Sequence, residues 1–291
     1  MRQSVLHRLA KMCGVVRRNT QMLGYFYRIS AVRRTAEADL RLGIMLAFIG
    51  GAVNAGGFLA IGQYTSHVTG IVSALADHLA LGEFAAALAA AAAWIAFVSG
   101  AATTAVLINL ARRRRLRSRY ALSLLFEAAL LLLFGVAGTY LTAMPDLLAP
   151  VTVLLLCFIM GLQNAIVTKV SGAVIRTTHL TGMTTDLGIE LGKLVYVNRR
   201  NLPQLAVRAN RDKLGMHARL IGAFLAGALT GALGFKTVGY GATIFLSAAL
   251  ALLSVGPIWM DIALRWKIRS RRNRRARMHP ASAGPFDKNR P

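Results

Sequence analysis

The chain alternates long apolar stretches with short basic ones. Two segments, 68–81 and 180–197, have helical character but are too short or too polar to cross a bilayer. Six others each hold the roughly 20 mostly apolar residues that a crossing helix needs. They are residues 42–62, 84–111, 120–142, 148–168, 217–235 and 239–264. The pattern therefore predicts an all-α, polytopic membrane protein with six transmembrane helices.

Lysine and arginine predict the orientation of these helices. If the N-terminus is cytoplasmic, six crossings put 34 of the 35 basic residues on the cytoplasmic side, as the positive-inside rule requires. A further crossing at 68–81 would turn the loop 112–119 outward, so we interpret 68–81 and 180–197 as re-entrant or interfacial elements. The basic residues form four blocks: the N-terminus through Arg41, Arg112–Arg119, Lys169–Arg219, and the tail from Arg265.

Composition agrees with lipid as the solvent. Charged residues make up 16% of the 291 positions, against roughly 25% in soluble domains. The net charge of +24 is typical of nucleic-acid-binding proteins, but these basic blocks alternate with membrane-length segments. We therefore expect contacts with anionic lipids and no nucleic acid partner. The predicted domains are a basic cytoplasmic arm at 1–40, a transmembrane repeat at 41–142, a second at 143–266, and a basic cytoplasmic tail at 267–291.

The two halves repeat a set of motifs in the same order. Asn-Ala followed by Thr-Ser/Thr-His-x-Thr-Gly occurs between Asn54 and Gly70 and again between Asn164 and Gly182. A Phe-x-x-Gly-Ala-x-Thr-x-Ala motif and a Tyr with a Leu-rich run then recur in both halves. Each half holds three crossings, an odd number, so the second half enters the membrane from the opposite face. The sequence predicts two inverted three-span repeats, each with a re-entrant or broken helix.

Residues of the repeated motif are the candidate substrate-binding residues. A Thr at the start of a short helix can cap its free N–H groups, and those groups favour an anion or a polar ligand. Two such helices that point into one cavity would form a shared site. Alternatively, Thr and His only satisfy backbone groups where a helix breaks, and the sequence leaves both readings open. The candidates are Asn54, His67, Thr69, Gly70, Asn164, His179, Thr181 and Gly182.

Three carboxylates are candidates for ion or proton coupling. Asp77 and Asp186 follow the two motifs on the helix face that carries the motif glycine. Glu127 interrupts the apolar third span, where a carboxylate is costly and a functional hypothesis by default. The alternatives are that Asp77 and Asp186 are solvated helix charges and that Glu127 reaches an Arg of the loop 112–119.

Several chemistries lack support in the sequence. No phosphate-binding loop, nucleophile elbow, HExxH or CxxC motif is present, so we expect neither an enzyme nor a cofactor. Cys13 and Cys157 have no metal-ligand spacing, and no metal site is expected.

Two stretches carry a resemblance to a known family. GGAVNAGGFLAIGQYTSHVTG and GLQNAIVTKVSGAVIRTTHLTGMTTDLG resemble the YoaK-like family of bacterial membrane proteins, a family with a domain of unknown function. The similarity covers roughly residues 40–265 and leaves both basic arms outside. It implies a bacterial inner-membrane protein and supplies no substrate; that both termini are cytoplasmic is predicted by the charge distribution alone.

The leading functional hypothesis is a secondary transporter or permease for a small polar or anionic solute, because inverted repeats with broken helices are common among such transporters. The alternative is a non-transporting scaffold or sensor that acts through its basic arms. Whether a second copy of the chain is a partner is undecided by the sequence.

Overall fold

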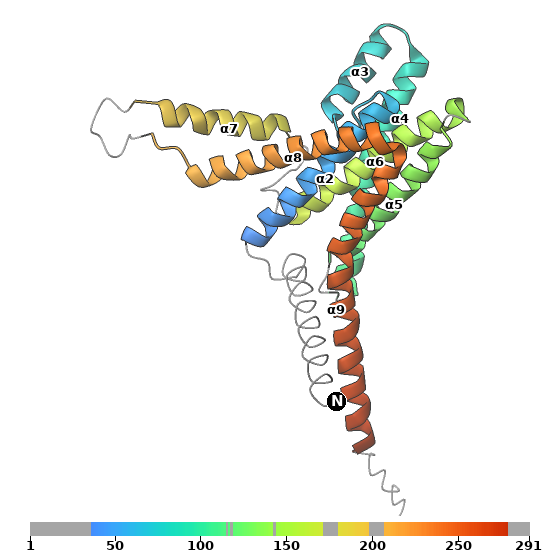
Figure 1. The fold of residues 1–291 in the computed structure, drawn as a ribbon, viewed down its shortest axis with the longest axis vertical. Helices are drawn as coiled ribbons and strands as arrows, with labels where there is room; N and C mark the ends of the chain where they lie inside the picture. Colours follow the sequence, from blue (N-terminus) through green and yellow to red (C-terminus); the bar gives the residue numbers. More distant parts are fainter. Residues whose placement is uncertain are drawn as a thin grey trace, which may run out of the picture.

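The structure, a computed structural model, describes residues 36–114, 116, 119–141, 144–170, 180–197 and 207–278. Within these ranges the regular structure is helical (Figure 1). The elements are α2 (Ala36–Ile61), α3 (Val68–Ala80), α4 (Phe84–Arg113), α5 (Ala121–Thr139), α6 (Pro145–Val170), α7 (Leu180–Val195), α8 (Arg211–Val238), a 3-10 turn η2 (Gly239–Gly241) and α9 (Ala242–Met278). The all-α prediction is confirmed.

Five helical stretches are long and apolar enough to cross a membrane, so the protein is a multi-pass membrane protein by length and composition. The sequence predicts six crossings. The difference lies in residues 211–255, which form one apolar run of 45 residues that the turn η2 divides. A single crossing needs about 20 residues. Two crossings within this run therefore stay a prediction.

The bundle is built from pairs that join an early helix to a late one. The most extensive pairings are α2 with α8, α4 with α6, and α5 with α9 (Figure 1). The core between them is apolar and fully buried, with Leu46, Leu131, Phe134, Leu156 and Ile159 among its members. Among the described helices, each of these three pairings joins the first half to the second, so the two halves share one core.

Glycine residues set the distance between the two helices of the α2–α8 pair. A Cβ atom added at Gly51 of α2 would collide with the Phe224 carbonyl oxygen of α8, and one at Gly227 would collide with the Phe48 carbonyl oxygen of α2. The backbones of α2 and α8 are therefore in direct contact, the arrangement that small residues permit between membrane helices.

Two short helices form hairpins that project from the bundle. Helix α3 packs on the start of α4, and α7 packs on the start of α8 (Figure 1). Their bounds agree with the short helical segments predicted at 68–81 and 180–197. The α3–α4 turn is closed by Gly82 at φ 75° and by a 2.7 Å contact between His78 Nδ1 and Glu83 Oε2.

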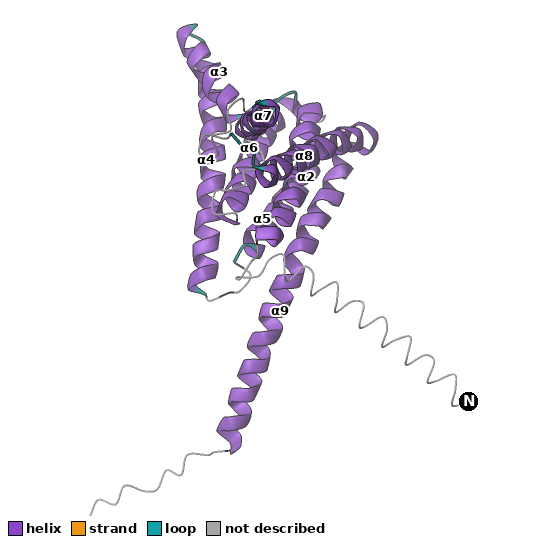
Figure 2. Ribbon diagram, turned by 90° about the vertical axis from the view of Figure 1, so that its left-hand side faces the viewer, coloured by secondary structure: helices purple, strands orange, loops and turns teal. Residues whose placement is uncertain are grey.

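Helix α9 continues beyond the predicted sixth span, which was expected to end at residue 264. It runs to Met278 and extends well past the rest of the bundle (Figure 2).

Candidate functional site

The first copy of the motif folds around the junction between α2 and α3. Asn54 of α2 accepts a hydrogen bond from Ser66 Oγ at 2.8 Å and one from Ser66 N at 3.4 Å. The motif therefore links its Asn to its loop, and at this position Asn54 satisfies backbone and hydroxyl groups where the helix breaks.

The His-x-Thr-Gly part of this copy begins α3. His67 is the N-cap residue and makes no side-chain capping hydrogen bond, so the Thr cap expected from the sequence is not formed on α3. The His67 ring folds over Gly70, where a Cβ atom would lie 2.5 Å from Nδ1. Only a residue without a side chain leaves room for the ring. His67, Thr69 and, two turns further along, Asp77 are exposed.

The second copy is described only in part. Asn164 lies in α6, where its Nδ2 donates to the Met160 carbonyl at 3.0 Å. Thr181 and Gly182 lie in the first turn of α7. His179 lies outside the described residues, so the cavity predicted to be shared by the two motif segments stays a prediction.

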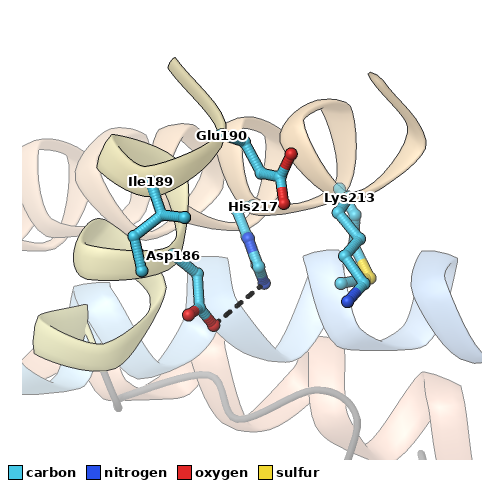
Figure 3. Close-up of a pocket in the computed structure, with 6 residues that line it drawn as sticks. Asp186, Ile189, Glu190, Lys213 and His217 are labelled. Atoms are coloured by element: carbon cyan, nitrogen blue, oxygen red, sulfur yellow. Dashed lines mark ion pairs between the residues drawn. The ribbon is translucent and has the colours of Figure 1, made fainter. Parts of the chain in front are cut away.

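A polar cavity opens between α7 and α8, one turn beyond the second motif. It has a volume of about 200 Å³ and is lined by Asp186, Ile189, Glu190, Lys213, Met216 and His217 (Figure 3). Its lining therefore combines two carboxylates, one imidazole and one ammonium group, which suits a small polar molecule rather than an apolar one.

Asp186 and His217 face each other across this cavity. Their closest atoms, Asp186 Oδ2 and His217 Nε2, are 3.9 Å apart, which is an ion-pair distance but too long for a hydrogen bond (Figure 3). The His217 side chain is only 8% exposed, and its Nδ1 atom has no partner among the described residues. The ring therefore presents its Nε2 atom to Asp186 at the cavity, whereas Nδ1 is buried away from solvent (Figure 3).

Glu190 fixes the wall opposite. Its two oxygens accept from Lys193 Nζ at 2.9 Å and from the Asn210 backbone N–H at 2.7 Å. Asn210 is in turn the N-cap of α8, because its side chain accepts from the N–H groups of Asp212 and Lys213. The hydrogen bonds from Lys193 first and from Asn210 second lower the pKa of the Glu190 carboxyl. Glu190 thus ties the motif helix α7 to the start of α8.

Glu127 lies apart from this cavity, in the middle of α5. Its side chain is 0% exposed, and neither carboxyl oxygen has a hydrogen-bond partner among the described residues. The alternative in which it reaches an Arg of the loop 112–119 finds no support, because the structure gives it no salt bridge within the described ranges.

In the part of the chain that the structure describes, no three His, Cys, Asp or Glu side chains gather closely enough to hold a metal ion.

Comparison with known families accounts for most of the chain. The profile of a family described as "Protein of unknown function (DUF1275)" matches residues 42–256. The chain belongs to the DUF1275 family. The YoaK-like resemblance carried by the two motif stretches is thereby confirmed. No curated protein and no solved structure matches the chain.

The matched region of this DUF1275 protein contains the α7–α8 cavity and Glu127. Sequence reasoning singled out Asp186 at this cavity but not Lys213 or His217, because it started the fifth span at residue 217, whereas α8 begins at Arg211. A signal was present: Asn210 followed by Asp212 is a helix start, and four residues separate Lys213 from His217 on one helix face.

Proposed function

We propose that this DUF1275 protein is a secondary transporter for a small polar solute, built from two inverted repeats. The observation that carries the proposal is reciprocal packing. If α2, α3, α4 and α5 are exchanged with α6, α7, α8 and α9 in order, α2–α8 becomes α6–α4 and α3–α4 becomes α7–α8, which are also packed pairs. Helix pairs α5–α9 and α2–α6 map onto themselves.

The reciprocity extends to single residues. A Cβ atom at Gly51 would collide with the Phe224 carbonyl oxygen, and one at Gly161 would collide with the Phe97 carbonyl oxygen. Gly51 and Gly161 are 110 positions apart, as are Asn54 and Asn164 of the motif. Contacts made by matching residues in two halves are what a duplicated unit produces.

A second pair of matching contacts joins a glycine of α4 to α6 and a glycine of α8 to α2. A Cβ atom at Gly100 would collide with the Phe158 carbonyl oxygen, just as one at Gly227 collides with that of Phe48. Units with an odd number of crossings, related in this way, have opposite orientations in the membrane. Transporters of this architecture bind solutes between their halves and alternate access by moving one half against the other.

The α7–α8 cavity lies within the second half rather than between the halves, and it supplies groups that can contact a polar solute. Asp186 offers a carboxylate, His217 offers its imidazole Nε2 atom, and Lys213 offers an ammonium group. The two carboxylates at this cavity disfavour a solute that is only anionic. A neutral or zwitterionic solute fits all three groups.

Solute uptake into proteoliposomes tests the proposal. We expect saturable flux of at least one member of a panel of neutral, zwitterionic, cationic and anionic solutes. We also expect a loss of about tenfold or more in Asp186→Asn and His217→Phe, since one buried hydrogen bond to a polar ligand is worth roughly 1–3 kcal/mol. The matched control is Glu83→Gln at the α3–α4 turn, which leaves the cavity intact.

Two results would contradict the proposal. One is the absence of flux for the whole panel with protein that elutes as a folded species. The other is flux that depends on the basic arms: a chain without residues 1–35 and 279–291 retains transport if the protein is a permease, whereas a scaffold that acts through the arms loses its function.

A further inference from the structure

We propose that Glu127 is a proton-binding site in the seam between α5 and α9, and that its proton is the coupling ion of the transporter proposed above. The side chain is fully buried, and both carboxyl oxygens are without a partner in the described part of the chain. The coupling role depends on the proposed transport function, whereas the proton site itself does not.

The seam around Glu127 carries hydroxyl groups. Ser123 lies one turn before Glu127 on the same face of α5, is fully buried, and has no partner for its Oγ within the described residues. Ser247 of α9 crosses the seam and donates to the Ala128 carbonyl at 2.7 Å. Ser254 and Thr243 of α9 are also buried and donate to carbonyls of their own chain segment.

Among the side chains that the structure describes, no counter-charge pairs with Glu127 from the elements packed against α5. The described ionisable side chains of these elements are Cys157 and Lys169 on α6, Arg112 and Arg113 on α4, and Tyr240 in η2. None of them makes a hydrogen bond or an ion pair with the Glu127 carboxyl.

A carboxylate in this position would be a buried charge with neither a counter-ion nor a donor, which membrane interiors strongly disfavour. The neutral acid is the form that the closed seam accepts.

Release of that proton requires water or a donor to reach the carboxylate, and the packed α5–α9 seam excludes both. Helix α5 belongs to the first half and α9 to the second. A motion of one half against the other therefore opens the surroundings of Glu127, so that the closed arrangement favours the protonated form and the opened arrangement favours release.

The matching position of the second half carries Ser247 rather than a carboxylate, since Tyr120 and Tyr240 align the two runs. Among the side chains that the structure describes, the seam thus holds one carboxyl group. We infer that one proton is bound for each transport cycle.

Infrared difference spectra between the reconstituted wild-type chain and its variants test the proton site directly. We expect the stretching band of a protonated, non-hydrogen-bonded carboxyl group at neutral pH, which disappears in Glu127→Gln and persists in the control Glu83→Gln. The Gln variant should fold, because an amide has nearly the shape of the neutral acid, and its elution and melting temperature verify this.

The outcomes separate the two proposals. A band that is absent from folded wild-type protein, or that survives in Glu127→Gln, overturns the proton site. Coupling is supported by two results together. The band is assigned to Glu127, and solute flux acidifies the vesicle interior in wild type but not in Glu127→Gln. Flux with no proton movement in wild type overturns coupling, and a band without any flux leaves the proton site standing while the transport function fails.

Discussion

At the scale of single residues, glycine determines how closely the helices approach. Gly227 of α8 lies against the Phe48 backbone of α2, and Gly231, one turn further, lies against the Ala52 backbone. Gly222 belongs to the same helix but faces open space. The same residue type therefore has opposite consequences at positions of α8 that are little more than one turn apart.

We expect Gly227→Ala to destabilise the protein by about 1–3 kcal/mol or more, because the new methyl group meets backbone that cannot move aside without separating α2 from α8. The matched substitution Gly222→Ala adds a methyl group in open space and should stabilise α8 by up to about 1 kcal/mol through helix propensity. Melting temperatures in detergent check both. Equal effects of the two substitutions would contradict the close α2–α8 contact.

At the scale of elements, the α7–α8 hairpin depends on one carboxylate. Because Glu190 accepts from Lys193 and from Asn210 at the α8 N-terminus, its pKa in the folded hairpin is lower than in an unfolded chain. A lowered folded-state pKa contributes stability above the unfolded pKa, about 4.3 for Glu, and that stability is lost as the pH falls through the folded value.

We therefore expect the hairpin to be ordered at neutral pH and to loosen below about pH 4. A spin label at the exposed Leu191 position reports this as increased mobility on acidification. In Glu190→Gln the label should be mobile at neutral pH already, with little further response to acid. Asp77→Asn on α3 serves as the control. An acid response in Glu190→Gln equal to that of wild type would rule out this carboxylate as the cause.

The short helices α3 and α7 show what could be predicted from the sequence at the scale of elements. The helical character of segments 68–81 and 180–197 predicted the short helices α3 and α7 to within about two residues, because helical character is a local property of the chain. The cavity between α7 and α8 was not predicted, because His217 comes from a segment 31 residues after Asp186 and only the hairpin brings the two together.

At the scale of the whole molecule, the orientation in the membrane is set by charge. The positive-inside rule predicts that the loop 112–119 is cytoplasmic and that the α2–α3 junction faces the outside. In a chain with Cys13 and Cys157 replaced by Ala, a membrane-impermeant maleimide should label Gln63→Cys in intact cells. It should label Ser118→Cys only after the membrane is opened. Labelling of Ser118→Cys from outside would remove the inverted arrangement of the two halves.

The sequence by itself determined the solvent, the class of fold and the family. Apolar length, the distribution of Lys and Arg, and the repeated motif are properties of the linear chain, and they sufficed to identify a multi-pass helical membrane protein of the DUF1275 family. They also placed Glu127 inside a predicted span, since a carboxylate within an apolar run is visible without any structure.

Only the tertiary structure decided which helices meet. It paired α2 with α8 and α4 with α6, brought His217 to Asp186, and left Glu127 buried with no partner among the described residues. The physical reason is that lipid treats all faces of an apolar helix nearly alike. The choice of partner then rests on close packing of small residues and on buried polar groups, and both depend on contacts between segments that are distant in the sequence.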